Sequence, residues 1–303
     1  MALCLQLRVA SYNVRVDHSE DIGTVHDWPK RRNLVTASLQ GLRADVVALQ
    51  EPSPHQAVDL REDLGPEWGV EVLACDPEAW NKAGSAGPDG QTRDGNGVAW
   101  RKDRLSLISP VDAIDLPTDS GFRRTCVVSR FRDRRNGAIV VLLSAHFDHV
   151  GDDRIRPTAT ARLPAKDASA ALVVQRALLE LETADAVVLS GDVNSFEDRD
   201  GSCYAALQSA ARGMLIDVRD APGCLEVDGG RGESSWEGWP TNTYCRARCP
   251  DSPNRFDQVF VSTNVKVLRT CVPEEKFLAS NGSVYASDHL PIVTDLMVVP
   301  RYH

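Results

Sequence analysis

The chain has 303 residues, with 34 lysines and arginines against 43 aspartates and glutamates, so the formal net charge at pH 7 is −9. Hydrophobic residues make up 42% and charged residues 25%, which excludes a disordered or fibrous protein. An acidic chain of this kind disfavours a polybasic protein that binds nucleic acid through many phosphates. No secretory leader pattern and no run of about 18 apolar residues is present, so we expect a soluble, cytoplasmic protein without a transmembrane segment.

Short apolar runs separated by turns predict β-strands along the whole chain. In chain order they cover residues 7–14, 44–51, 69–75, 97–102, 126–131, 138–147, 186–193, 256–262 and 290–299. Apolar residues at spacings of three and four predict helices over residues 28–42 and 168–181. Segments rich in Gly, Pro and Asp predict surface loops, which cover residues 83–96, 151–166 and 221–240. Because strands and helices interleave without a linker of biased composition, we expect one α/β domain with mixed sheets over residues 1–303.

Polar side chains that can bind metal or move protons stand at the ends of several of these strands. They are Asn13, Glu51, His146, Asp148, Asp192, Asn194, Asp257, Asp288 and His289. Taken alone, each is more simply interpreted as a turn residue, a helix cap or a satisfied core histidine. Taken together, they predict one crevice at the edge of a sheet, because residues that follow strands of an α/β sheet can converge there.

Six short motifs carry these residues. They are SYNVR (11–15), LQE (49–51), SAHFDH (144–149), GDVN (191–194), RFDQVFVS (255–262) and SDHLP (287–291). In this order the sequence resembles the endonuclease/exonuclease/phosphatase superfamily, and its HFDHVG version is similar to a branch of mostly uncharacterised hydrolases. The resemblance implies the deoxyribonuclease I-like fold, a four-layered sandwich of two mixed β-sheets flanked by helices.

The resemblance also implies a metal site. Glu51 matches the metal-binding glutamate of the superfamily, Asn13 matches an asparagine that supports the metal, and Asp288 matches a further metal contact. A hard carboxylate suits Mg²⁺, with Mn²⁺ as an alternative ion.

The catalytic residues implied by the resemblance are His146, Asp192, Asn194, Asp257 and His289. Asp192 and Asn194 match the pair that positions the attacking water and holds a phosphate oxygen. His289 matches the active-site histidine, and Asp257 the carboxylate that orients it. His146 matches a histidine that bonds the scissile phosphate or protonates the leaving oxygen.

Four further residues are predicted substrate contacts. Arg15 stands where exonuclease III relatives carry an acidic metal ligand, and a guanidinium suits a phosphate or carboxylate on the substrate. The segment DGNGVAW lacks the tyrosine of those repair enzymes and leaves Asn96 as the nearest polar substitute, so repair of abasic DNA is disfavoured. Arg124 matches an arginine that precedes a central strand, and Asp148 extends the HFDH motif.

Three features of the predicted loops stay open. The arginine that follows HFDHVG in similar proteins could be Arg154, Arg156 or Arg162. Aromatic residues of a Gly-rich loop could stack on a base or hold the loop to the body; they are Trp236, Trp239 and Tyr244. A zinc site at Cys245 and Cys249 is disfavoured for want of a second ligand pair, and a disulfide among these two and Cys224 stays open.

The predicted activity is divalent-metal-dependent hydrolysis of a phosphodiester or phosphomonoester by in-line attack of an activated water. A shared site does not choose the substrate, and we favour a small or medium phosphate ester. A nuclease acting on DNA or RNA is the alternative. A catalytically silent binding scaffold is the hypothesis from another class, disfavoured because every key position holds a chemically competent residue.

Overall fold

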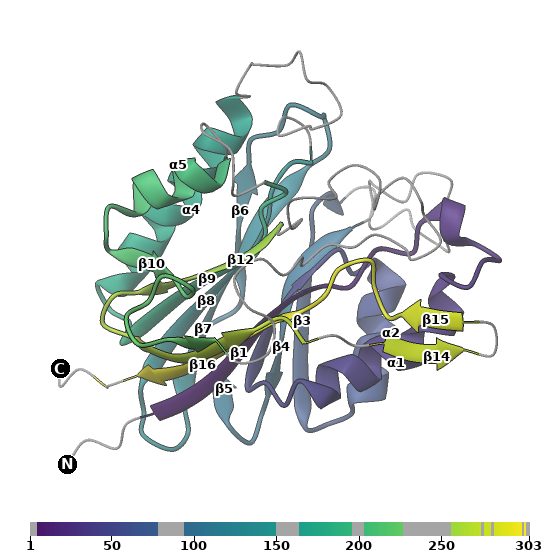
Figure 1. Ribbon diagram of the computed structural model, residues 1–303, viewed down its shortest axis with the longest axis horizontal. Helices are drawn as coiled ribbons and strands as arrows, with labels where there is room; N and C mark the ends of the chain where they lie inside the picture. The colour runs from purple at the N-terminus through teal and green to yellow at the C-terminus, as the bar shows by residue number, and fades with distance from the viewer. Residues whose placement is uncertain are drawn as a thin grey trace.

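Two seven-stranded β-sheets lie face to face in the computed structural model, which describes residues 5–77, 94–149, 164–195, 203–226, 256–273, 276–279, 282–298 and 300 (Figure 1). The first sheet has the order β11 (Leu225–Glu226), β13 (Lys266–Cys271), β16 (Ile292–Val298), β1 (Leu5–Asn13), β2 (Val46–Gln50), β4 (Gly95–Arg101) and β3 (Trp68–Ala74). The second has the order β10 (Leu215–Asp217), β12 (Asp257–Ser262), β9 (Ala186–Asp192), β8 (Ile139–His146), β7 (Arg124–Asp133) and β5 (Leu105–Leu107), and β6 (Asp112–Leu116) pairs with β7. A separate hairpin joins β14 (Lys276–Ala279) to β15 (Gly282–Tyr285).

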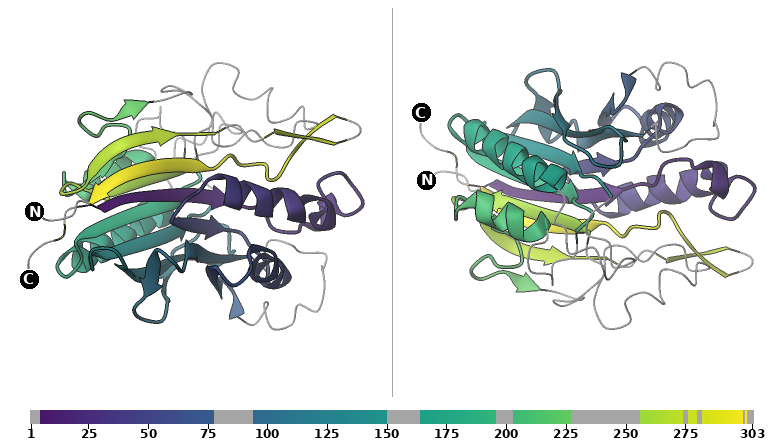
Figure 2. Two further views of the ribbon diagram at one scale, coloured as in Figure 1. Left: turned by 90° about the horizontal axis from the view of Figure 1, so that it is seen from below. Right: turned by 90° about the horizontal axis from the view of Figure 1, so that it is seen from above.

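Helices cover the outer face of each sheet. Helices α1 (Trp28–Gly41) and α2 (Pro54–Leu64) pack on the first sheet, and α4 (Pro164–Leu181) and α5 (Cys203–Ala211) pack on the second. Figure 2 shows these helices on the outside with the sheets between them. One buried apolar cluster fills the space between the sheets and two others lie under the helices. The predicted four-layered α/β sandwich is therefore confirmed.

Burial on both faces explains why the central strands were recognisable as apolar runs. All five residues of β2, VVALQ, and all seven of β9, AVVLSGD, are buried. A strand that is covered on both sides reads as a continuous apolar run, without the alternation of a half-exposed strand.

The central strands also bring the site together. Strand β1 runs parallel to β2 with Asn13 opposite Gln50, and β8 runs parallel to β9 with His146 opposite Asp192. Strand β12 is antiparallel to β9, so it begins with Asp257 opposite Asp192. Parallel strands end at the same edge of a sheet, and contacts of β1 with β9 and of β2 with β8 join the two sheets.

Several elements differ from the sequence-based expectation. Helix α4 begins at Pro164, inside the segment predicted as a loop, and residues 95–96 of another predicted loop belong to β4. Helices α2 and α5, a 3₁₀ helix η1 (Ser19–Asp21), and the short strands β5, β6, β10, β11, β13, β14 and β15 were not predicted. Within the described part of the chain, no helix has the length and apolarity needed to cross a membrane.

Candidate active site

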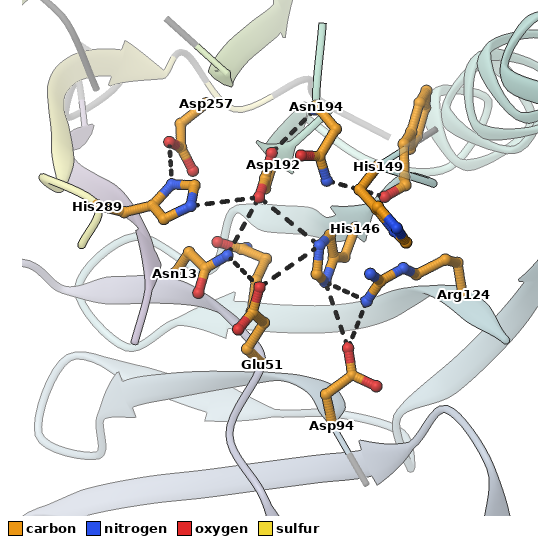
Figure 3. Close-up of polar contacts among 12 residues, drawn as sticks. Asn13, Glu51, Asp94, Arg124, His146, His149, Asp192, Asn194, Asp257 and His289 are labelled. Carbon is orange, nitrogen blue, oxygen red and sulfur yellow. Dashed lines mark hydrogen bonds and ion pairs between the residues drawn. The ribbon is translucent and has the colours of Figure 1, made fainter. Parts of the chain in front are cut away.

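A cavity of about 260 Å³ opens at the end of the two sheets where the parallel strands finish. Eight of the twelve predicted site residues line it, and these are Arg15, Glu51, Arg124, His146, Asp192, Asn194, Asp288 and His289. Asn13 and Asp257 lie directly behind it and bond residues of the lining. The structure therefore gathers ten of the twelve residues at one place, and all of these except Arg15 and Asp288 are labelled in Figure 3.

Two carboxylates meet at the centre of this cavity. The side-chain nitrogen of Asn13 lies 2.9 Å from Oε1 of Glu51 and 3.1 Å from Oδ2 of Asp192. Nε2 of His146 lies 3.8 Å from the same Glu51 oxygen and 3.6 Å from the same Asp192 oxygen. The ligand atoms of Glu51, His146 and Asp192 all fall within 4.8 Å of one another, as expected of a metal site.

The donor set fits a hard divalent cation. Carboxylate oxygens are the protein ligands that Mg²⁺ takes, usually one or two per site. Both carboxylates converge on one amide, and the charged forms of two carboxylates held this close are stabilised by a cation placed between them. The residues present are therefore suited to hold such an ion.

Asp288, the further predicted ligand, is oriented by other contacts. Its Oδ2 lies 3.4 Å from Nη1 of Arg15, and the hydroxyl of Ser287 donates to its Oδ1 over 3.3 Å. Arg15 also pairs with Glu20 and Asp21, at 2.8 Å and 3.3 Å. Arg15 thus lines the cavity as a charge that is already shared among several carboxylates.

His289 is held between two carboxylates. Its Nδ1 lies 2.8 Å from Oδ2 of Asp257 and its Nε2 lies 3.7 Å from Oδ2 of Asp192. Although burial opposes a charge, Asp257 and Asp192 raise the pKa of His289 to about 10. Burial raises the pKa of Asp192 to about 7, even though the charge of His289 opposes this rise. The imidazole is therefore a cation at neutral pH and Asp192 is close to its titration point.

His146 has a different environment. Nη1 of Arg124 lies 3.2 Å from its Nδ1, and Arg124 in turn pairs with the buried Asp94. Burial, assisted by the charge of Arg124, lowers the pKa of His146 well below its usual value. Burial also opposes ionisation of Glu51, yet His146 and Arg15 outweigh it and lower that pKa below its usual range. Nε2 of His146 lies 3.8 Å from Oε1 of Glu51, beyond hydrogen-bond distance, and the hydrogen bond to this oxygen comes from Asn13.

Three residues of the cavity have a left-handed backbone. Arg15, Glu51 and Asn194 have φ values of 58°, 68° and 49°, and only two other described non-glycine residues have a positive φ. This conformation costs about 1–3 kcal/mol for a residue with a Cβ and persists only where the surroundings enforce it. Such strain clusters at functional sites, which agrees with the position of these three residues.

Two of the predicted substrate contacts lie outside the cavity. The side-chain nitrogen of Asn96 is fully buried between the sheets and donates to the main-chain oxygens of Thr125 and Ser144, at 2.7 Å and 3.1 Å. Asp148 accepts from the main-chain nitrogens of residues 119 and 120, at 2.7 Å and 2.9 Å. Both residues hold main chain near the site, so their predicted role in contacting substrate is not supported.

Other cavity residues had not been predicted from the sequence. Asp94 lies in a segment predicted as a loop, and the packing of β4 against β7 of the other sheet brings it to Arg124. His149 belongs to the HFDH motif that drew attention to Asp148, and it lines the cavity. His18 and Glu20 follow the SYNVR motif and also line it, but nothing in their local sequence marks them.

The open features of the predicted loops lie outside the described residues. These are Arg154, Arg156, Arg162, Trp236, Trp239, Tyr244, Cys245 and Cys249.

Several solved structures have the same fold. An endonuclease/exonuclease/phosphatase family protein from Bacteroides thetaiotaomicron superposes with a TM-score of 0.73 at 22% identity, covering 98% of this chain and 99% of that one. A mannosyl-6-phosphatase from Bacteroides thetaiotaomicron VPI-5482 gives a TM-score of 0.70 at 22% identity, covering 96% and 99%. TDP2 from D. rerio, complexed with a single-strand DNA product, gives 0.64 at 17% identity, covering 96% and 98%.

Because these identities are below 25%, the structural similarity shows the fold alone. The family is shown by a match of the sequence to a family model. No curated protein matches the chain. The model of the Endonuclease/Exonuclease/phosphatase family matches residues 10–289, which include every residue of the cavity. The chain therefore belongs to the Endonuclease/Exonuclease/phosphatase family.

Proposed function

We propose that the protein is a divalent-metal-dependent phosphoesterase that hydrolyses a phosphodiester or phosphomonoester by in-line attack of water. The observation that carries the proposal is the meeting of Glu51, Asp192 and His289 in one cavity, from strand ends far apart in the chain. The family and its structural neighbours, among them a mannosyl-6-phosphatase, support the same class of reaction.

Glu51 and Asp192 would hold the metal, with Asn13 supporting them. Mg²⁺ is the ion that this donor set suits best, and Mn²⁺ is the alternative. A bound divalent cation polarises a phosphoryl oxygen and neutralises the charge that develops on it. Asp288 contributes through Arg15, which it holds at the edge of the cavity.

Asp192 and His289 would act on the attacking water. The carboxylate of Asp192 accepts a hydrogen bond from the water and orients it toward phosphorus. His289, kept charged by Asp257, lies 3.7 Å from the same carboxylate and stabilises negative charge on the phosphate. The pair therefore combines an acceptor for the water with a donor for the phosphate oxygens.

His146 and Asn194 would stabilise the transition state by donating hydrogen bonds. The Asn194 amide donates to the main-chain oxygen of Phe147 over 3.1 Å, and an amide nitrogen has a second N–H for a phosphate oxygen. Removing one donor of this kind costs about 3 kcal/mol of transition-state stabilisation in enzymes with an oxyanion hole.

A small phosphate ester is the substrate class that the described cavity suits best. Both arginines of the lining are already ion-paired, Arg15 with acidic residues that include Glu20 and Arg124 with Asp94. Within the described residues, the positive charge of the cavity therefore suits one phosphate group better than the row of phosphates along a nucleic acid.

The test is hydrolysis of p-nitrophenyl phosphate, bis-p-nitrophenyl phosphate and hexose 6-phosphates with Mg²⁺ or with EDTA. Turnover should require the metal, and Asp192→Asn and His289→Gln should each lower kcat by about 100-fold. Asp103→Asn and His55→Gln serve as matched controls because these side chains are 69% and 47% exposed, outside the cavity. Unchanged turnover in the two cavity variants, or full activity in EDTA, would exclude the proposal.

A nuclease is the second candidate function. It is favoured by the likeness to TDP2, whose structure holds a single-strand DNA product. Binding of an oligonucleotide through many phosphates weakens steeply with salt, whereas binding of a small monoester changes little. Activity on single-stranded DNA that falls with increasing salt would favour the nuclease.

A binding scaffold without activity would show neither metal-dependent turnover nor a metal-dependent melting temperature.

A further inference from the structure

Helix α1 buries an arginine beneath the site. Arg31 is 0% exposed, and its guanidinium donates to four main-chain oxygens. Nε bonds His26 at 2.6 Å, Nη1 bonds Val14 at 3.0 Å and Ala286 at 2.8 Å, and Nη2 bonds Arg15 at 3.0 Å. Arginine suits such a place because its planar group offers five N–H donors in fixed directions.

Two of the bonded segments carry the residues of the cavity. Val14 and Arg15 directly follow Asn13, and Ala286 lies three residues before His289. The segments are 13–16 and 286–289, which also meet directly where the Ser287 hydroxyl donates to the Asn13 oxygen over 2.7 Å. Arg31 is thus a second connection between two parts of the site that are far apart in the chain.

The main-chain carbonyl of Arg15 accepts two side-chain hydrogen bonds. It accepts from Nη2 of Arg31 at 3.0 Å and from Nε2 of Gln56 at 2.9 Å. Arg15 has a φ of 58°, which is unfavourable for a residue with a Cβ unless its surroundings hold it. The two bonds are therefore part of what keeps Arg15 in the conformation that directs it to Asp288.

We infer that Arg31 is a positioning residue that locks segments 13–16 and 286–289 together and so sets the geometry of the site. Arg31 does not line the described cavity, so it acts through the residues that it holds. Loss of its guanidinium leaves buried carbonyls without donors and lets the two segments separate. A displacement of about 1 Å in a catalytic constellation lowers the rate about 100-fold.

Arg32 provides a matched control on the same helix. Its guanidinium faces α2, where it pairs with Asp59 and Asp63 at 2.6 Å each and with Glu62 at 3.1 Å. Its loss removes several ion pairs between α1 and α2 but no hydrogen bond to segments 13–16 or 286–289. If a loss of kcat in the Arg31 variants followed only from weaker packing of α1, an equal loss of kcat should therefore appear in Arg32→Met.

The experiment compares Arg31→Met, Arg31→Lys and Arg32→Met in the full chain. Its kinetic part rests on the proposed phosphoesterase activity, and its structural part does not. We expect kcat to fall about 100-fold in Arg31→Met with a smaller change in KM, and less in Arg31→Lys, because an ammonium still serves some of the carbonyls. Arg32→Met should keep kcat within about twofold even where its melting temperature falls.

A crystal structure of Arg31→Lys gives the readout that does not depend on activity. We expect Arg15 to leave the left-handed region and its contact with Asp288 to open. Segments 13–16 and 286–289 that are unchanged in that structure would overturn the inference, as would equal losses of kcat in the Arg31 and Arg32 variants. Should Arg31→Met fail to fold, Arg31→Lys decides the kinetic test, and wild-type kcat in it counts against the inference. Absence of any hydrolysis by the wild-type protein would instead reject the proposed function and leave the structural result to stand.

Discussion

Nη1 of Arg124 lies 3.2 Å from Nδ1 of His146. A guanidinium nitrogen can only donate, so Nδ1 accepts and the imidazole proton lies on Nε2. That nitrogen faces the carboxylates of Glu51 and Asp192 in the cavity. Of the two roles expected for His146, a hydrogen bond to the scissile phosphate is therefore better supported than protonation of the leaving oxygen.

Arg124→Met should lower both activity and stability. Without the donor at Nδ1, His146 no longer has a fixed tautomer, and we expect kcat to fall by at least about tenfold. The buried carboxylate of Asp94 also loses its partner, and breaking a buried ion pair from one side costs about 3 kcal/mol of unfolding free energy. Urea unfolding and steady-state kinetics measure the two effects.

The double variant Arg124→Met/Asp94→Leu separates these effects, because the Asp94 carboxylate lies 3.7 Å from Nδ1 of His146 and leucine offers that nitrogen no donor. Removal of the unpaired carboxylate should restore most of the unfolding free energy. It should not restore kcat, since Nδ1 of His146 still lacks its donor. Recovery of full activity in the double variant would show that the tautomer of His146 is set in another way.

Lys166→Met should lower both stability and kcat, because Lys166 supports the main chain of Asn194. Nζ of Lys166, a buried residue of α4, donates to the main-chain oxygen of Asn194 over 2.6 Å, and Asn194 has a φ of 49°. A hydrogen bond from a charged group contributes about 2 kcal/mol, so unfolding should become easier by about this amount. We expect kcat to fall about tenfold as Asn194 relaxes. Lys30→Met is the control, because its exposed Nζ bonds carbonyls of a surface loop, and it should leave kcat unchanged.

The charge of His289 should appear in the pH dependence of stability when metal is removed with EDTA. Burial opposes the charge, but Asp257 and Asp192 raise its pKa from 6.5 to about 10. The folded chain therefore binds a proton that the unfolded chain has lost, so stability falls as pH rises between these values. The unfolding free energy of the wild type minus that of His289→Gln should be largest below pH 6.5 and decline toward about pH 10. A difference that is constant over this range would contradict a charged His289.

The architecture was predictable because the strands that build it are buried on both faces. Strands such as β2 and β9 are continuous apolar runs, and the polar residue that ends each one is a visible departure. Helix α2 could also have been predicted, since Ser53 caps it, Pro54 begins it and Gln56 completes a capping box. Strands of two or three residues, such as β5 and β11, could not, because so short a segment carries no recognisable period.

The parts of the site that were missed depend on contacts between distant segments. Asp94 stands in a Gly-rich stretch, and its place beside Arg124 follows from the packing of β4 against β7 across the two sheets. Arg31 lies in a predicted helix next to Arg32, and the sequence does not distinguish the fully buried arginine from the partly exposed one. Asn96 shows the opposite case, since a polar residue expected to contact substrate instead links β4 to β7 and β8.

Gly191→Ala should separate the two strands that carry His146 and Asp192. Gly191 pairs with Ala145 in the register of β8 and β9, has a φ of 150°, and a Cβ on it would lie 1.9 Å from the Ala145 oxygen. Because that neighbour is main chain, the strands must move apart, which should cost about 3 kcal/mol of unfolding free energy and most of the activity. Gly137→Ala is the control, since Gly137 has a φ of 77° with no atom within 4 Å of the added Cβ, and only the cost of the left-handed backbone, about 1 kcal/mol, applies there. If both variants lose the same stability and keep the same kcat, close approach of β8 and β9 at Gly191 is not what aligns His146 with Asp192.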